Sequence, residues 1–456
     1  MRVTTADAWD LRPGTVHAWR VTAPAGAGTP VGLSPDQRNH LAAATAGEPS
    51  VWLTAAFDVP GPIDPVALEG AFRDLVARHG TLQCTAMVSD GVPTARRHHP
   101  ASLTWVRRVV ASTTTSAETR ALVRDLLDAG CAPLDGPALL PAAVSRPDRS
   151  TVVLGLDHLH ADATSVAVVV EDLHALYDAR RAGVPAGAGA SGLPPAGCFV
   201  EACAARAPVA PEDPRLAAWH AALGGLGHRL PTFPLDLGVA PGERAAQAGV
   251  LVPLLDADAV AALDRAARAG GASTCAATLG AFAGAVADRG GPTDLPVLVP
   301  VSTRRTPGEQ RAVGWFTATV PLVLRADAAP GETARDLRAA RELAGVPLDQ
   351  VLATLPVPLG RTRGDVFMVS WLDYRRLPGQ ARARARAAHH VSAATRADDL
   401  QLWLSRTDAG LALRARIPAT AVARATLDGV VEAWRARLSA LARAPEYLHA
   451  GGGSGV

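Results

Sequence analysis

The sequence predicts a two-lobed protein of the α/β or α+β class. Its 456 residues exceed what one hydrophobic core usually organises. Segments with strand patterns and helix patterns mix through both halves of the chain. Small residues and prolines without periodicity mark a break between the halves. We therefore expect an N-terminal lobe at 1–182, a Gly/Pro linker at 183–198 and a C-terminal lobe at 199–456.

Local patterns in the N-terminal half support a mixture of strands and helices. Ser34 can cap a helix whose first residue is Pro35. Apolar residues at helical spacing predict another helix over 65–79. The remaining patterns predict strands over 51–59 and 151–156, and a helix from Thr164 or Ser165 to about Arg181.

The C-terminal half shows the same mixture. Helical patterns cover 199–224, 256–269, 273–288 and 419–443. Short apolar runs predict strands over 295–301, 315–324, 367–373 and 399–405.

The composition excludes several kinds of chemistry. All 45 basic residues are arginines, so the chain has no lysine for a Schiff base or for nucleotide phosphates. A formal net charge of +2, with no basic stretch interleaved with aromatic residues, argues against a nucleic-acid partner. The arginine-dense run Arg375–Arg386 has the pattern of a solvated face, and a contact surface for an acidic partner is the alternative.

Cysteine usage and hydropathy predict a cytoplasmic protein. The five cysteines are scattered without a CxxC motif, which fits a reducing compartment better than disulfides or a zinc site. The N-terminus lacks the apolar core of a signal peptide, and no apolar run approaches the roughly 20 residues that cross a membrane. A formal GxGxxG match at 187–192 lies inside the linker, so we interpret it as a coincidence of composition.

The segment 154–165, LGLDHLHADATS, carries the strongest chemical signal. Asp157, His158, His160 and Asp162 follow an apolar strand, where a rigid sheet holds loop side chains in fixed geometry. In one interpretation these groups only satisfy one another and cap the next helix. In a second, His158, His160 and Asp162 bind a metal, although no second ligand cluster supports it. In the third, His158 is a general base held by neighbouring carboxylates.

This segment resembles the HHxxxDG motif of nonribosomal peptide synthetase condensation domains. Their relatives include the carnitine, chloramphenicol and polyketide-associated acyltransferases. His158 matches the second, catalytic histidine of the motif, and Asp162 matches its aspartate. Asp157 stands at the first histidine, Ala163 replaces the glycine, and Ser165 matches a serine that often follows.

Further segments resemble motifs of this family in the same order, so the resemblance covers nearly the whole chain. Two of them look more like the free-standing acyltransferase branch, and the others resemble motifs of the wider family. The two are RPGTVHAWR at 12–20 and WLDYRRLPG at 371–379; the others are LSPDQR at 33–38, VARHGTLQC at 76–84, VSTRR at 301–305 and VGWFTATVPL at 313–322.

The resemblance implies a free-standing condensation enzyme of secondary-metabolite, including antibiotic, biosynthesis. Two chloramphenicol-acetyltransferase-like lobes would form a V-shaped pseudo-dimer with a central tunnel, and His158 would lie at its midpoint. An acyl thioester on the phosphopantetheine arm of an acyl or peptidyl carrier protein, supplied in trans, or on coenzyme A, would meet an alcohol or amine acceptor. No metal or bound cofactor is implied, because a thioester is already activated.

The resemblance also implies roles for other residues. Asp162 would form a buried ion pair with Arg304 that ties the catalytic loop to a strand of the other lobe, with Arg305 as the competitor for this role. Trp315 and Thr317 would line the tunnel, and a core tryptophan is the alternative for Trp315.

Two departures from the motif bear on activity. Asp157 changes the charge beside His158 and thus its basicity, whereas the first histidine is usually structural. Ala163 would be strained if its backbone position needs a positive φ.

Three alternatives remain open at this point. The chain would be an acyl-coenzyme A-dependent O-acyltransferase in the first, a non-catalytic docking module in the second and an epimerase-type relative in the third. A docking module has no need of His158, and an epimerase needs a further acidic base in the second lobe.

Overall fold

The computed structural model describes residues 1–134, 136–185 and 192–443, and these fall into two compact units. Unit 1 comprises Met1–Pro208, Ser302–Ala318 and Tyr374–Thr395. Unit 2 comprises Val209–Val301, Thr319–Asp373 and the chain from Arg396 onward. Most of the formal GxGxxG match, at 187–191, lies outside the described residues.

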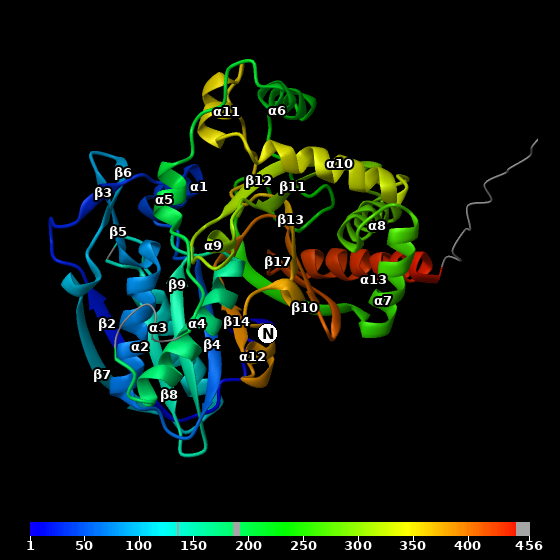
Figure 1. Cartoon of the computed structure of the whole chain (residues 1–456). Coiled ribbons are helices and arrows are strands. Elements are labelled where there is room, and N and C mark those ends of the chain that lie inside the picture. Colours follow the sequence, from blue (N-terminus) through cyan, green and yellow to red (C-terminus); the bar gives the residue numbers. More distant parts are fainter. Residues whose placement is uncertain (135, 186–191, 444–456) are drawn as a thin grey trace, which may run out of the picture. The chain divides into compact units, whose positions relative to one another are not determined.

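Unit 1 contains a seven-stranded sheet and a separate sheet of three strands (Figure 1). The large sheet has the order β1 (Arg2–Thr5), β14 (His389–Ser392), β4 (Trp52–Pro60), β9 (Arg149–Asp157), β8 (Leu139–Ser145), β2 (Thr15–Thr22) and β7 (Thr104–Ser112). The small sheet has the order β3 (Thr29–Val31), β6 (Val92–Arg97) and β5 (Cys84–Ser89).

The two faces of the large sheet bury different helices, because successive residues of a strand point to opposite sides. Val152 and Leu154 of β9 pack into the cluster that holds the apolar residues of α2 (Pro65–Arg78) and α4 (Ala163–Arg181). Val153 belongs to the opposite cluster, with Val123 and Leu127 of α3 (Ser116–Gly130). Strand β9 is therefore covered on both faces, which explains its continuous apolar sequence.

Capped helices carry the segments that meet at the end of β9. Ser34 and Gln37 form a reciprocal capping box at the start of α1 (Pro35–Thr45), as predicted for Ser34 and Pro35. Asp162 caps α4, so that helix begins at Ala163, slightly before the predicted start. The remaining helical segments of unit 1 are η1 (Gly80–Gln83), η2 (Pro100–Ser102), α5 (Phe199–Ala204), α9 (Pro307–Gln310), η3 (Tyr374–Arg376) and α12 (Gln380–Ala385).

Unit 2 is also a sheet packed against helices (Figure 1). Its sheet has the order β12 (Thr317–Arg325), β11 (Asp294–Ser302), β13 (Met368–Asp373), β16 (Gln401–Thr407), β17 (Gly410–Pro418), β10 (Ala245–Asp256) and β15 (Arg396–Ala397). Helix α13 (Ala421–Arg443) packs against α7 (Ala257–Ala269) and α8 (Thr274–Asp288). The other helices are α6 (Pro214–Gly225), α10 (Pro330–Leu343) and α11 (Leu348–Thr354).

The mixed α/β class and most predicted elements are confirmed, but one predicted helix is wrong. The segment 199–224 forms two helices, α5 and α6, with residues 205–213 between them. Pro208 and Pro211 lie in this gap, and each lacks the backbone N–H that a continuous helix needs. The arginine-dense run forms η3 and α12, with Arg376 and Arg384 exposed.

The two units do not follow the predicted boundaries at 1–182 and 199–456. Residues 199–208, 302–318 and 374–395 belong to unit 1, although the linker precedes all three in sequence. The last of these segments supplies β14, which pairs antiparallel with β4 and parallel with β1. The V-shaped arrangement and the central tunnel stay predictions.

Among the described residues, no single helix is long and apolar enough to cross a membrane. The pair α7 and α8 reaches that length and hydropathy only together, and the two helices are bent by 97° at their junction.

Candidate active site

The loop of residues 158–161 leaves β9 directly after Asp157. The backbone N–H of His158 donates to the carbonyl of Val51, and that of His160 donates to the carbonyl of Asp157, at 2.8 and 3.0 Å. The first bond ties the loop to Val51, directly before β4, and the second closes a turn at the end of β9, so His158 projects from a rigid sheet.

His158 lies beside two other rings of unit 1. Its ring centroid is 4.0 Å from that of Trp315 and 6.5 Å from that of His40. The residue is half-buried, and its Nδ1 atom is buried without a hydrogen-bond partner among the described residues.

The surroundings of His158 favour its neutral form. Burial lowers the pKa of His158 to about 4, and the charge of His40 lowers it further, while Asp157 and Asp162 oppose this shift. The imidazole is therefore unprotonated at neutral pH, which is the state that can accept a proton.

Asp157 is fully buried and satisfied by three donors. Its carboxylate accepts hydrogen bonds from Ser50 Oγ at 2.9 Å and from the N–H of Leu159 at 2.8 Å, and it contacts His40 Nε2 at 2.6 Å. A buried carboxylate is tolerated only with such partners. The substitution of Asp157 for the first histidine of the motif is thus compensated locally.

Asp162 and Arg304 form a buried ion pair, as the resemblance implied. Both terminal nitrogens of the guanidinium group contact the carboxylate, with Nη2 at 3.0 Å from Oδ1, and the side chains of Arg304 and Asp162 are 1% and 8% exposed. Arg304 also donates to the carbonyls of Glu309 and Ala312 and lies over the ring of Phe316. The pair lies within unit 1, whereas a pair between the lobes was expected.

Ser165 and the residues around Gly314 extend this network. Asp162 accepts hydrogen bonds from the N–H and Oγ of Ser165, both at 2.8 Å, and from the N–H of Phe316 at 3.1 Å. Ser165 Oγ is also 2.9 Å from the carbonyl of Gly314. Ala163 is the first residue of α4, and its backbone φ is not positive. The strain considered for an alanine at this position of the motif therefore does not arise.

The remaining predicted residues differ in whether they contact His158 or Asp162. Trp315 contacts the ring of His158, whereas Thr317 is half-buried in β12, two residues further along the chain. Arg305 is exposed, and only its backbone binds Glu309, so it does not compete with Arg304 for Asp162. Whether Trp315 and Thr317 line a substrate tunnel stays a prediction.

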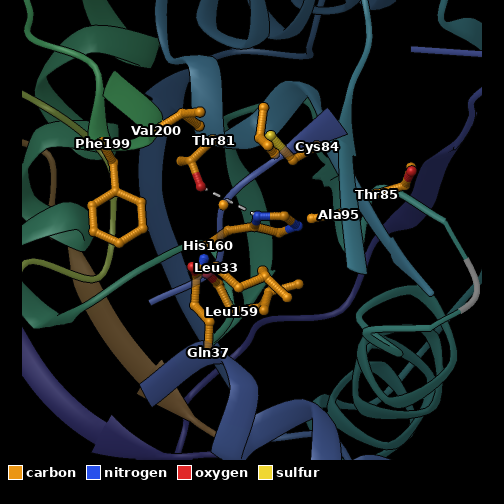
Figure 2. Close-up of a pocket in the computed structure, with 12 residues that line it drawn as sticks. Leu33, Gln37, Thr81, Cys84, Thr85, Ala95, Leu159, His160, Phe199 and Val200 are labelled. Atoms are coloured by element: carbon orange, nitrogen blue, oxygen red, sulfur yellow. Dashed lines mark hydrogen bonds between the residues drawn. The ribbon is translucent and has the colours of Figure 1, made fainter. Parts of the chain in front are cut away.

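His160 lines a small pocket (Figure 2). The pocket has a volume of about 20 Å³, and Gln37, Thr81, Cys84 and Phe199 contribute to its wall. His160 Nδ1 is 3.4 Å from Thr81 Oγ1, and burial lowers the pKa of His160 to about 4. A cavity of this size holds about one water-sized sphere, so it does not accommodate an acyl chain in this conformation.

The described residues include no group of three or more His, Cys, Asp or Glu side chains placed to hold a metal ion. His158 and His160, which the metal interpretation requires together, lie against different neighbours: Trp315 for the first and Thr81 for the second.

Three residues of the site, His40, Gln37 and Ser50, received no predicted role from the sequence. His40 and Gln37 are three positions apart on α1, and both reach the segment 157–159: His40 contacts Asp157, and Gln37 donates to the carbonyl of Leu159 at 2.8 Å. This spacing places them on one helix face and is the signal that the sequence offered. Ser50 lies in no motif and gave no signal.

Comparison with known proteins identifies the family. Residues 29–370 match the profile of the Condensation domain. The match spans most of the chain, and the chain therefore belongs to the condensation-domain family.

Curated relatives of similar length are acyltransferases. The chain is 27% identical over 398 residues to "Acyltransferase PapA3" of Mycobacterium tuberculosis, covering 82% of this chain and 81% of that protein. It is 27% identical over 341 residues to "Trehalose-2-sulfate acyltransferase PapA2" of Mycobacterium bovis, covering 71% and 70% of the two chains. Within its family, this chain is an acyltransferase.

Solved structures show the same fold. "PapA2 acyl transferase" matches with a TM-score of 0.85 and 23% identity, covering 97% of this chain and 100% of that one. The "First condensation domain of the calcium-dependent antibiotic synthetase in complex with substrate analogue 3a" matches with a TM-score of 0.65 and 20% identity, covering 91% and 97%. The chain thus has the condensation-domain fold, which consists of two chloramphenicol-acetyltransferase-like lobes.

Proposed function

We propose that the chain transfers an acyl group from a thioester donor to an alcohol acceptor, with His158 as the general base. The observation that carries this proposal is the neutral, half-buried imidazole of His158 at the end of β9, in tilted ring contact with Trp315. The bidentate pair of Asp162 and Arg304 fixes the other end of the catalytic loop.

The proposed reaction proceeds by direct transfer. The acceptor oxygen attacks the thioester carbonyl while His158 takes the hydroxyl proton; because Nδ1 is buried, we assign this role to Nε2. The carbon–sulfur bond then breaks, the thiolate leaves, and the imidazolium returns the proton to sulfur. The products are an ester and a free thiol.

The low pKa of His158 suits both steps of the proposed reaction. As the new bond forms, the attacking hydroxyl becomes strongly acidic, so a weak base suffices to accept its proton. The imidazolium of a histidine with a pKa of about 4 is in turn a strong acid toward the leaving thiolate.

The donor and the acceptor follow from the family and its relatives. A phosphopantetheine thioester on an acyl or peptidyl carrier protein is the proposed donor, and coenzyme A carries the same arm. Trehalose, named in one relative, offers hydroxyl groups, which supports oxygen over nitrogen as the attacking atom. A role in secondary-metabolite biosynthesis and a cytoplasmic location are parts of the same proposal.

The test presents each acyl group as two different thioesters to two matched acceptors. Acyl carrier protein and coenzyme A thioesters of several acyl lengths are incubated with an alcohol and with the amine of the same carbon skeleton, and mass spectrometry follows the products. We expect protein-dependent ester formation above the reaction without protein. Thioester hydrolysis alone, or no product from any donor, would contradict the proposal.

A further inference from the structure

His40 contacts the carboxylate of Asp157, the residue directly before His158. It lies on α1, 117 positions before Asp157, and its Nε2 is 2.6 Å from Asp157 Oδ1. The Asp157 side chain is fully buried and that of His40 is 11% exposed. A contact this short between an imidazole and a carboxylate marks a strong hydrogen bond.

His40 also touches the ring that holds His158. The centroid of its ring is 5.8 Å from that of Trp315 at an interplanar angle of 78°, an edge-to-face contact. The centroid of the Trp315 ring is also 4.0 Å from that of His158, at an interplanar angle of 42°. The indole of Trp315 therefore lies in contact with both imidazoles.

The charge of Asp157 affects the protonation state of His158. A buried carboxylate one residue before His158 stabilises the imidazolium form, which is the wrong form for a base. His40 acts in the opposite direction. The titratable and charged groups around His158 are His40 from α1, Asp157 from β9, His160 from the loop, and Asp162 at the start of α4 with its partner Arg304.

We propose that His40 is a positioning residue for His158: its contacts with Asp157 and Trp315 fix the catalytic ring and offset the neighbouring carboxylate. This inference rests on the proposed function, because it assumes that His158 is the base. Burial is the main cause of the lowered pKa of His158, and the charge of His40 adds to it against the effect of Asp157, which stands at the first position of the HHxxxDG motif.

The first test needs no substrate. Histidines labelled with ¹³C at Cε1 are titrated by NMR, and the His158 signal is assigned by its loss in His158→Ala. We expect the His158 midpoint to rise in His40→Ala and His40→Gln, because the opposing charge is lost. We expect it to fall in Asp157→Asn, since the stabilising carboxylate is gone.

The second test separates position from charge. In the acyl-transfer assay, His40→Ala lowers kcat by about 10- to 100-fold, because the ring of His158 loses its support. His40→Gln keeps a donor for Asp157 and recovers part of kcat, while the His158 midpoint stays raised. Asn39→Ala, an exposed neighbour on α1, is the matched control and leaves both readouts unchanged.

The outcomes distinguish the two proposals. If wild type shows no turnover, or His158→Ala keeps it, the proposed function fails. If wild type depends on His158 but its midpoint and kcat are the same in His40→Ala as in Asn39→Ala, only the role of His40 is overturned. Loss of thermal stability in His40→Ala with an unchanged midpoint in the folded His40→Gln variant would likewise reduce His40 to a structural residue.

Discussion

His158 combines properties that rarely coincide on one side chain. It is half-buried against Trp315, yet its loop is anchored by backbone hydrogen bonds to β4 and by Asp162 at the start of α4. Burial keeps the ring neutral, and the anchored loop keeps it in place. Burial thus sets the protonation state of the ring, and the backbone hydrogen bonds set the position of its loop.

The pH dependence of catalysis follows from the first of these properties. Because the pKa of His158 is lowered to about 4, the neutral base persists well below the ordinary histidine range. We expect kcat/KM to stay level as the pH falls from 7 to about 5 and to decline only near 4. A profile measured with a saturating donor checks this, and a decline centred near 6.5 would contradict it.

The pair of Asp162 and Arg304 predicts a large effect on stability. Arg304→Ala leaves a buried, unpaired carboxylate, so we expect the free energy of unfolding to fall by about 3–5 kcal/mol. Arg305→Ala is the matched control, because that side chain is exposed and should change stability by no more than about 0.5 kcal/mol. Denaturant unfolding measures both, and equal stability of the two variants would refute the role of Arg304.

The sequence disclosed some of these residues and not others for a physical reason. Asp157, His158 and Asp162 were visible because they lie together on one short segment. Arg304 was found only through the resemblance, since it lies 142 positions from Asp162. His40 was missed because its role depends on a contact between α1 and β9 that local patterns do not encode.

At the scale of the element, β9 is the support on which the site depends. Its position is set by close packing on α3, where Gly155 leaves no room for a side chain: an added Cβ would lie 2.1 Å from Leu127 Cδ2. The glycine is required here by close approach of the helix, not by its backbone angles.

This packing gives a testable substitution. Gly155→Ala forces the side chain of Leu127 to move in its packing on β9, and we expect a loss of about 1–3 kcal/mol in the free energy of unfolding. The double variant Gly155→Ala/Leu127→Ala makes room for the new methyl group and should be more stable than the sum of the two single changes predicts. Additive losses in the four-member cycle would show that the contact does not act as described.

Elements with local signals were predictable, and elements defined by partners were not. The caps of α1 and the apolar run of β9 follow from neighbouring residues. Strand β14 has four residues and exists because β1 and β4 pair with it. The break between α5 and α6 was readable from Pro208 and Pro211, and the helical spacing on either side concealed it.

At the scale of the whole molecule, the chain interleaves its two units. Segments 302–318 and 374–395, late in the sequence, complete unit 1 and bring Arg304 and Trp315 to His158. A cut at the Gly/Pro linker would therefore separate the catalytic loop from part of its own unit. The predicted lobe boundaries were based on the Gly/Pro-rich composition of the linker. Composition does not indicate that segments 302–318 and 374–395 return to unit 1.

Unit 2 carries its own pH-sensitive group. Asp399 is fully buried and accepts hydrogen bonds from the backbone of Phe233 and Leu400, and burial raises its pKa to about 7. A raised carboxyl pKa means that the folded state holds its proton longer than the unfolded state does. The stability it contributes is complete below about 4 and is lost as the pH rises toward 7.

Asp399→Asn tests this assignment. The variant keeps an acceptor oxygen for both backbone donors and has no proton to lose, so its advantage over wild type should grow by about 1.4 kcal/mol per pH unit between 4 and 7. Urea unfolding across this range measures the difference. A constant difference between the two proteins would contradict a protonated Asp399 in the folded state.

The central claim, acyl transfer that depends on His158, is tested most directly by comparing wild type with His158→Ala in the acyl-transfer assay. His99→Ala, an exposed histidine of the same unit, is the control, and circular dichroism verifies folding. The account predicts ester formation by wild type and His99→Ala, reduced by about 10²- to 10⁴-fold in a folded His158→Ala protein. Turnover that survives in His158→Ala would contradict it.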